Sequence, residues 1–303
     1  MLPDNNWYGH RKILLKYLGE KDKEIFAWIQ HGWEPQILGG MPRNLKSKIY
    51  PLFFWSKFNR RFYSKNIKSF TIGSPFLYLC KILEKKKKIE RPEGTLVFPI
   101  HTSQDYSQKS DHIDLIRKVE KVSSGPYTVC FYYRDFTKKN ILPYKKKGWK
   151  IVCCVRKRND IKSLYRLYNE IVNHKSIIVS EFTTALFYSM YLKRKTKVII
   201  GKSYKIGKYE KIFLKFYKKK YPELFNNFLS SDKGHKLAKI ELGYENIKNK
   251  EDLKKLLGIN SIYKSILAKL FKILYDLIYG SGLRKGQNIS EKELIKYIKK
   301  ARS

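Results

Sequence analysis

The sequence predicts an α/β protein with parallel sheets. Between Thr95 and Gly201, five short apolar runs rich in β-branched residues alternate with helical stretches, a pattern typical of a doubly wound parallel sheet. Polar turns follow these runs, at the strand ends where ligands bind in such sheets. The chain has 303 residues, of which 43% are hydrophobic, and this length favours two domains.

The first domain is expected to span residues 1–90 and to be small. Helical spacing places Ile13, Leu14 and Leu18 on one side of its first helix. Only two or three apolar runs follow, fewer than a complete doubly wound half contains. The expected elements are a helix over Trp7–Leu18, a strand over Glu24–Gln30, an apolar segment over Leu52–Phe58, a strand over Ser69–Ile72 and a helix over Phe76–Leu83.

Two turns in this domain are candidates for ligand contact. His31 and Gly32 follow the strand that ends at Gln30, and the glycine permits close approach of the backbone. Gly73 and Ser74 form a second turn, followed by Pro75 at the favoured first position of a helix. The alternatives are a capping or core-edge histidine at the first turn and ordinary turn chemistry at the second.

The second domain is expected over residues 91–230, after a charged, breaker-rich linker that begins at Lys85. Strands and helices then alternate regularly. The expected strands are Thr95–Ile100, Tyr127–Tyr133, Lys150–Val155, Ile177–Val179 and Lys197–Gly201, and the expected helices are Asp111–Val122, Lys138–Lys147, Ile161–His174 and Ala185–Leu192.

The strand-to-helix turns of the second domain carry the polar residues that matter most. Right-handed crossovers bring these turns to one edge of the sheet, where ligands bind in open α/β folds. A histidine, a carboxylate, arginines and hydroxyls on one edge predict a site for nucleotide phosphates. The simpler alternatives are helix caps and solvated loops. The residues on this edge are His101, Thr102, Ser103, Arg134, Asp135, Arg156, Arg158, Ser180, Glu181, Thr183 and Thr184.

The remaining region, residues 231–303, is expected to be helical and basic, as is the stretch Lys205–Tyr221 before it. Its most amphipathic stretch, Ser261–Tyr279, has a wide apolar arc and a narrow polar stripe. Such an arc fits a buried helix. It also fits a helix that lies on an anionic membrane surface. A short basic helix is expected over Ser290–Lys300.

Charge and cysteine content limit the partners and the compartment. Lys and Arg number 65 against 26 Asp and Glu, a formal net charge of +39, which favours nucleic acid, anionic lipid or nucleotide ligands. The four cysteines lie in apolar runs without zinc-ligand spacing, as in a reduced cytoplasmic protein. We expect no signal peptide and no transmembrane helix, and a cytoplasmic location with peripheral contact with the inner face of the membrane as an option.

Several motifs are absent from the sequence. It contains no Gly-x-Gly-x-x-Gly, no phosphate-loop lysine motif, no serine-hydrolase elbow and no Asp-x-Asp. The last absence argues against transferases that hold a nucleotide sugar through a carboxylate-bound cation. We therefore expect neither a metal nor a cofactor.

Five segments between about Trp7 and Gly201 form a recognisable series. They are I-Q-H-G-W (Ile29–Trp33), T-I-G-S-P-F-L-Y (Thr71–Tyr78), L-V-F-P-I-H-T-S (Leu96–Ser103), V-C-F-Y-Y-R-D (Val129–Asp135) and V-S-E-F-T-T-A-L-F-Y-S (Val179–Ser189). Together they resemble bacterial surface-polysaccharide glycosyltransferases of the GT-B fold, as found in capsule and O-antigen clusters. That family is distantly similar to bacterial sialyltransferases and to CDP-glycerol glycerophosphotransferases.

The resemblance implies two Rossmann-like domains with a nucleotide-sugar donor between them, and a metal-independent, membrane-peripheral enzyme. It implies that His31, with Gly32, is the catalytic histidine, that His101 is a second one, and that Thr183 or Thr184 binds the donor phosphate. Glu181 departs from the family, which has serine or asparagine there. A basic, helical extension follows the two domains.

The expected reaction is therefore glycosyl transfer to a growing surface polysaccharide or a lipid-linked glycan. A CMP-linked donor is favoured, and CDP-linked and UDP-linked donors remain open. Two alternatives are kept: a CDP-glycerol-type transferase that forms phosphodiesters, and a non-catalytic basic protein that binds nucleic acid. Against the second, the aromatic residues lie in apolar runs and no nucleic-acid-binding module is evident.

Overall fold

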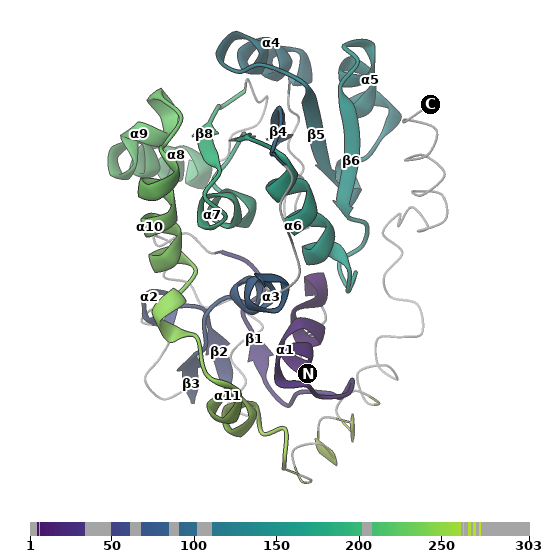
Figure 1. The fold of residues 1–303 in the computed structure, drawn as a ribbon, viewed down its shortest axis with the longest axis vertical. Helices are drawn as coiled ribbons and strands as arrows, with labels where there is room; N and C mark the ends of the chain where they lie inside the picture. The colour runs from purple at the N-terminus through teal and green to yellow at the C-terminus, as the bar shows by residue number, and fades with distance from the viewer. Residues whose placement is uncertain are drawn as a thin grey trace. The chain divides into compact units, whose positions relative to one another are not determined.

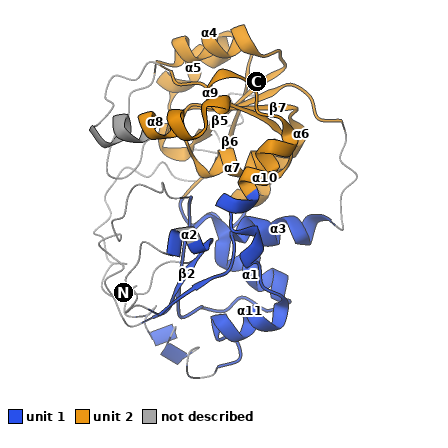
Figure 2. Cartoon of the chain, turned by 90° about the vertical axis from the view of Figure 1, so that its left-hand side faces the viewer, with its two compact units in different colours: residues 1–87, 158–162, 239–288 blue, residues 88–157, 163–238, 289–303 orange. Residues whose placement is uncertain are grey.

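The computed structural model describes residues 5, 7–33, 50–60, 68–84, 91–101, 111–201 and 208–261, and six positions between 263 and 273. The chain divides into two compact units, coloured separately in Figure 2. Unit 1 comprises Met1–Lys87, Arg158–Lys162 and Lys239–Asn288, and unit 2 comprises Lys88–Lys157, Ser163–Ala238 and Ile289–Ser303. The segment Lys239–Asn288 is thus grouped with unit 1, whereas the sequence predicts a separate region over 231–303.

Unit 2 is built on a five-stranded parallel sheet with the order β6-β5-β4-β7-β8, which confirms the α/β class and the parallel sheet expected here. Helices separate successive strands (Figure 1). The elements are β4 (Thr95–Phe98), α4 (His112–Val122), β5 (Tyr127–Tyr132), α5 (Lys138–Lys146), β6 (Lys150–Val155), α6 (Ser163–Asn173), β7 (Ser176–Val179), α7 (Thr184–Tyr191) and β8 (Lys195–Val198).

The strands β4 to β7 of unit 2 are largely apolar on both faces because helices cover them. Val97 and Ile178 are fully buried, and both belong to a core cluster that includes Val119 from α4 and Tyr144 from α5. Continuous apolar strands of this kind are typical of parallel sheets. The strand β8 begins two residues earlier than predicted, because Lys195 and Thr196 pair with Ser176 and Ile177 of β7.

The strand order of unit 2 reverses direction beside β4. From β4 the chain continues outward through β5 to β6, and then returns to the other side of β4 to form β7 and β8. The carboxyl ends of β4 and β7 are therefore neighbours. The chain continues from β4 to one side of the sheet, to β5, and from β7 to the other side, to β8. A topological switch point of this kind is where open parallel sheets bind ligands.

Unit 1 contains a three-stranded parallel sheet with the order β1-β2-β3. The helix α1 packs against α3 and α11, and Ile13, Leu14 and Leu77 are fully buried. The elements are a 3-10 helix η1 (Trp7–Gly9), α1 (His10–Leu18), β1 (Trp28–Ile29), β2 (Leu52–Phe54), α2 (Lys57–Arg60), β3 (Ser69–Thr71), α3 (Pro75–Glu84), the 3-10 helix η4 (Tyr244–Asn246) and α11 (Lys250–Leu257).

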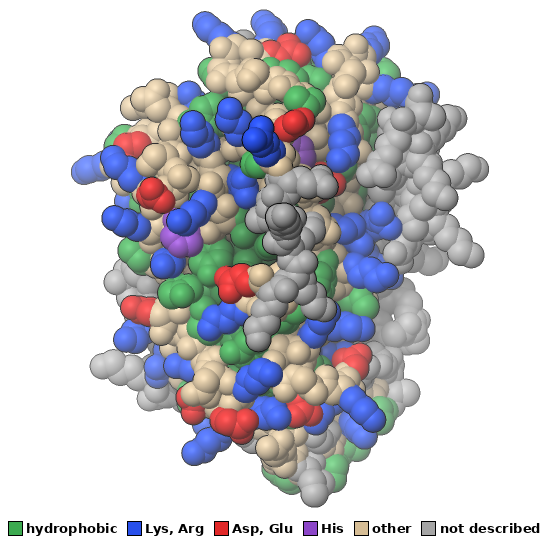
Figure 3. Space-filling model, viewed as in Figure 1, with side chains coloured by type: hydrophobic (Ala, Val, Ile, Leu, Met, Phe, Trp, Pro, Cys, Tyr) green, Lys and Arg blue, Asp and Glu red, His purple; other side chains and the backbone are tan. Residues whose placement is uncertain are grey.

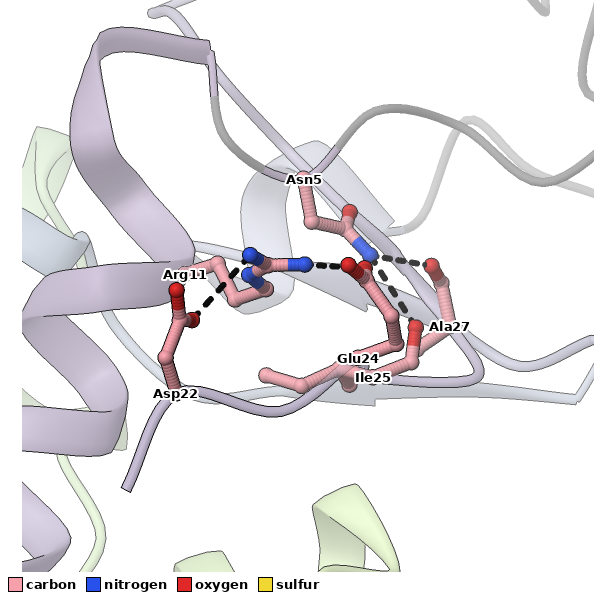
Figure 4. Close-up of polar contacts among 6 residues, drawn as sticks. All are labelled: Asn5, Arg11, Asp22, Glu24, Ile25 and Ala27. Atoms are coloured by element: carbon pink, nitrogen blue, oxygen red, sulfur yellow. Dashed lines mark hydrogen bonds and ion pairs between the residues drawn. The ribbon is translucent and has the colours of Figure 1, made fainter. Parts of the chain in front are cut away.

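The strand predicted over Glu24–Gln30 is only two residues long, and Figure 4 shows the reason. The side-chain amide of Asn5 donates to the carbonyl oxygens of Ile25, at 3.3 Å, and Ala27, at 2.7 Å. The guanidinium of Arg11, on α1, pairs with the carboxylates of Asp22 and Glu24. Side chains therefore hold this segment in an irregular path, and strand pairing with β2 begins only at Trp28.

Three further helices follow β8: α8 (Lys208–Lys220), α9 (Pro222–Asn226) and α10 (Ser231–Glu241). Within the described residues no helix has both the length and the apolarity needed to cross a membrane. The expected helix over Ser290–Lys300 and most of Ser261–Tyr279 lie outside the described residues. The described positions of the latter from Tyr263 onward are helical, and Tyr263, Ile266, Leu270 and Ile273 are exposed.

A membrane test follows from this exposure. Ile266 and Leu270 are each 52% exposed, so replacing both with aspartate should remove apolar contact with a bilayer at little cost in stability. If this helix lies on anionic lipid, co-flotation with phosphatidylglycerol vesicles should fall in the double variant. The matched control is Ile240→Asp, because Ile240 is a 67%-exposed isoleucine on α10. Equal flotation of the double variant and the wild type would exclude this helix as the membrane contact.

Candidate functional site

The switch point of unit 2 carries a histidine and a carboxylate in direct contact. His101 follows β4 and Glu181 follows β7. The Nδ1 atom of His101 lies 2.5 Å from Oε1 of Glu181, and the backbone N–H of His101 donates to the same oxygen at 3.2 Å. Parallel pairing of β4 with β7 brings these two residues, 80 positions apart in the sequence, to one point.

The contact determines which nitrogen of His101 faces a ligand. An ionised carboxylate only accepts hydrogen bonds, so Nδ1 carries the proton that is shared with Glu181. The nitrogen that can exchange a proton with a ligand is then Nε2. Loss of hydration lowers the pKa of His101, but the carboxylates of Glu181 and Asp135 outweigh this effect, and the net pKa is raised. More of the charged imidazolium is therefore present near neutral pH than for an ordinary histidine.

The end of β5 brings Arg134 and Asp135 to the same edge of the sheet. The pairing register of β5 shifts between Cys130 and Tyr132, and the chain then enters the 3-10 helix η3 (Tyr133–Asp135). Such irregularities re-aim the side chains that follow them. The ring of Tyr132 lies edge-on to the imidazole of His101, with 5.4 Å between centroids. The Nε of Arg134 donates to the hydroxyl of Tyr133 at 3.1 Å, and this hydrogen bond raises the pKa of Arg134.

The β7–α7 turn supplies hydroxyls without partners. Within the described part of the chain, the side-chain oxygens of Ser180 and Thr183 are buried and have no hydrogen-bond partner. Thr183 occupies the N-cap position of α7, but its side chain makes no capping hydrogen bond. The capping alternative therefore does not account for this hydroxyl. Because an unpaired buried hydroxyl is costly, a bound polar ligand is a reasonable partner for both. Thr184 begins α7.

Aromatic residues of α8, of α9 and of the position between them pack against this turn. The ring of Phe182, between Glu181 and Thr183, stacks on Tyr217 at 4.3 Å with an interplanar angle of 13°. It also lies 6.0 Å from Tyr221 and 5.7 Å from Phe225. The basic segment that follows the sheet thus supports the turn that carries the candidate site.

A further histidine near the edge was not predicted from the sequence. His112 is the first residue of α4, its Nδ1 lies 3.0 Å from the hydroxyl of Tyr144, and the Asp135 carboxylate acts on it as it does on His101. Burial nevertheless lowers its pKa. The sequence did contain a signal for His112. It follows Asp111, at the start of the helix that comes after β4, and the chain leaves β4 at the edge where the candidate site lies.

His31 and Gly32 lie in unit 1. Three aromatic rings surround the imidazole of His31: Trp7, with centroids 4.1 Å apart, Tyr8 and Trp28. Burial, with the nearby His10 and Arg158, lowers the pKa of His31 to about 3. An imidazole with this pKa is a poor match for a general base at neutral pH, and the catalytic role that the resemblance implies for His31 stays a prediction.

The turn at Gly73 and Ser74 is explained by packing within unit 1. Ser74 is fully buried, and its backbone N–H donates to the carbonyl of Leu242 at 2.9 Å. Gly73 has a φ of +75°, and a Cβ there would lie 3.0 Å from the carbonyl oxygen of Gly243. The returning chain thus covers the turn that the sequence suggested for a ligand.

The other candidates are placed as follows. Thr102 and Ser103 lie outside the described residues. Arg158 belongs to unit 1, where its guanidinium lies 3.2 Å from the centre of the Trp7 ring. Arg156 remains in unit 2. No group of three or more potential metal ligands occurs among the described histidine, cysteine, aspartate and glutamate residues. The structure therefore brings together His101, Glu181, Asp135 and the hydroxyls that follow β7.

Comparison of the sequence with protein-family models and with curated proteins gives no match.

Proposed function

We propose that this chain is a glycosyltransferase that uses a nucleotide-activated sugar, and that unit 2 binds the nucleotide at the carboxyl edge of its sheet. The observation that carries the proposal is the contact between His101 and Glu181 across the switch point. Parallel sheets bind nucleotides at such points. The unpaired hydroxyls of Ser180 and Thr183 lie in the β7–α7 turn, on either side of Glu181, as expected of partners for phosphate or ribose oxygens.

The proposed role of His101 follows from the charge that develops during the reaction. Transfer of a glycosyl group leaves negative charge on the departing nucleotide phosphate. The raised pKa of His101 favours an imidazolium that donates from Nε2 to this phosphate. The positive end of the α7 dipole, at its N-terminus, favours the same charge. Positioned donors of this kind act most strongly where charge develops in the transition state.

The wider assignment rests on the resemblance. It includes a GT-B arrangement in which both units are Rossmann-like, and a glycan or lipid-linked acceptor. A CMP-linked donor is favoured. In this scheme unit 1 provides the acceptor side, and His31 is the other catalytic histidine beside His101.

Nucleotide binding tests the proposal directly. At a hundredfold excess over its dissociation constant, a ligand that binds only the folded state stabilises it by about 2.7 kcal/mol. We expect one of CMP, CDP, UDP and GDP to raise the melting temperature selectively without added metal, and a Ser180→Ala/Thr183→Val variant to lose part of that rise. A selective effect of CDP would favour glycerol-phosphate-type transfer. If no nucleotide has an effect, the proposal fails.

The matched control is Ser123→Ala, which alters a hydroxyl in the same unit. That hydroxyl donates to the carbonyl of Val119 at the end of α4, at 3.0 Å. A loss of nucleotide stabilisation in this control as large as in the Ser180→Ala/Thr183→Val variant would show that the effect is not local to the β7–α7 turn.

A further inference from the structure

A groove with a volume of about 510 Å³ lies on unit 2, and no residue that lines it belongs to the candidate site. Its walls come from the C-terminal half of α4, from β8 and the chain after it, and from α8 and α9. No acidic side chain is among its described lining residues. Its four charged lining residues are Lys118, Lys121, Lys197 and Lys218.

Two of these lysines hold the walls together. The ammonium group of Lys118 donates to the carbonyl of Ile200 at 3.1 Å and pairs with Asp114 at 2.7 Å. The ammonium group of Lys197 donates to the carbonyl of Asn226 at 2.8 Å. The first contact joins α4 to the chain after β8, and the second joins β8 to the end of α9. The positive charge of Lys197 is therefore held at the groove by a neutral carbonyl group, whereas that of Lys118 is compensated by Asp114.

The other two lysines are exposed, one on each side. Lys121 lies on α4, and Lys218 lies on α8 with its ammonium group 5.9 Å from the ring centre of Phe225. Apolar surface lies between them, contributed by Val122, Pro222 and Phe225. The groove thus combines several cationic groups with an apolar wall.

We infer that this groove binds an organic phosphate, with the phosphate held by the lysines and an apolar or aromatic substituent held against Phe225 and its neighbours. Ammonium groups bind phosphate as point charges. The apolar wall gives a phosphate with an organic substituent an advantage over the inorganic ion. Two sources share this chemistry: a lipid phosphate with a hydrocarbon chain, and a nucleotide with a base. The inference does not depend on the proposed function.

The test must separate the groove from the general charge of the protein. On the face shown in Figure 3, Lys and Arg side chains are scattered among acidic and neutral ones, and a net charge of +39 attracts any anion. The test variant is Lys121→Glu with Lys218→Glu. The matched control is Lys146→Glu with Lys219→Glu, which changes the net charge equally at exposed positions outside the lining.

Affinity should be measured by isothermal titration of the full chain with hexyl phosphate, UMP and inorganic phosphate. We expect hexyl phosphate or UMP to bind more tightly than inorganic phosphate. The preferred probe should lose at least about tenfold in affinity, about 1.4 kcal/mol, in the test variant and not in the control. Phe225→Leu then distinguishes a nucleotide from a lipid phosphate. If a base stacks on the ring, this variant should bind UMP more weakly and hexyl phosphate with unchanged affinity.

Three results would overturn the inference: no binding of either organic phosphate, equal losses in the test and control variants, or affinity no greater than that of inorganic phosphate. If UMP alone keeps its affinity in the test variant, UMP binds at another site, and the result with hexyl phosphate then decides for or against the groove. Circular dichroism of each variant establishes that the lysine changes leave the fold intact.

Discussion

Replacing His101 with glutamine should lower the rate of donor cleavage by about 10²–10³-fold, the usual cost of removing one donor that faces developing charge. Glutamine keeps a polar group of similar reach but carries no positive charge. The KM for the donor should change much less, because the charge that His101 faces develops mainly in the transition state and an interaction of this kind acts on kcat. Release of the nucleotide from an activated sugar, with kcat and KM measured separately, tests this expectation.

The control for that measurement is His235→Gln in the same unit. Its ring bonds the carbonyl of Tyr191 at 2.6 Å, and it does not belong to the candidate site. A loss of activity in His235→Gln equal to that in His101→Gln would point to general destabilisation. Unchanged activity in His101→Gln would remove His101 from the mechanism.

Glu181→Gln should change how activity depends on pH. The carboxylate of Glu181 raises the pKa of His101, so the active imidazolium is lost only as the pH rises through that raised value. Without the carboxylate, burial and Asp135 act alone, the pKa falls, and the imidazolium is lost at a lower pH. The alkaline limb of the kcat/KM profile should therefore move to lower pH. A limb that stays in place would show that His101 is not the group that titrates.

The candidate site of unit 2 could be predicted from the sequence because the signals for it lie in short, continuous segments. The strands β4 to β7 of that unit are short, largely apolar runs, and polar residues such as Ser180 and Glu181 follow them. Parallel strands with helical crossovers bring those ends to one edge. The side-by-side placement of β4 and β7 was not evident locally, because it depends on the strand order. The direct contact of His101 with Glu181 therefore required the structure.

Unit 1 was harder to predict because its contacts join distant parts of the chain. The Gly73–Ser74 turn has the residues of a ligand-binding loop. However, the carbonyl of Leu242, far along the chain, accepts the backbone N–H of Ser74. Asn5 similarly replaces strand pairing over Ile25 and Ala27. A histidine after a strand predicts a catalytic group, but the rings of Trp7 and Trp28 give His31 an environment that no local pattern reports.

The largest expected effect on stability is that of Gly243→Ala. Gly243 has a φ of +70°, and a Cβ there would lie 1.8 Å from the carbonyl oxygen of Trp55 and 2.6 Å from its carbonyl carbon. That oxygen also accepts the backbone N–H of Gly73 at 3.0 Å. Trp55 is fully buried, and its backbone N–H donates to the side chain of Gln30. The backbone of Trp55 therefore has little room to move away.

Gly19→Ala separates this close approach from backbone strain. Gly19 has a φ of +75° in the same unit, but a Cβ there would meet no atom within 4 Å. Gly19→Ala should lower the free energy of unfolding by about 1 kcal/mol, the strain of a left-handed alanine. Gly243→Ala should lower it by about 3 kcal/mol or more. Tryptophan fluorescence during urea unfolding measures the difference, since Trp7, Trp28, Trp33 and Trp55 all lie in unit 1. Equal costs for the two variants would mean that the chain from Leu242 onward is not held against Trp55, and the packing explanation of the Gly73–Ser74 turn would fail with it.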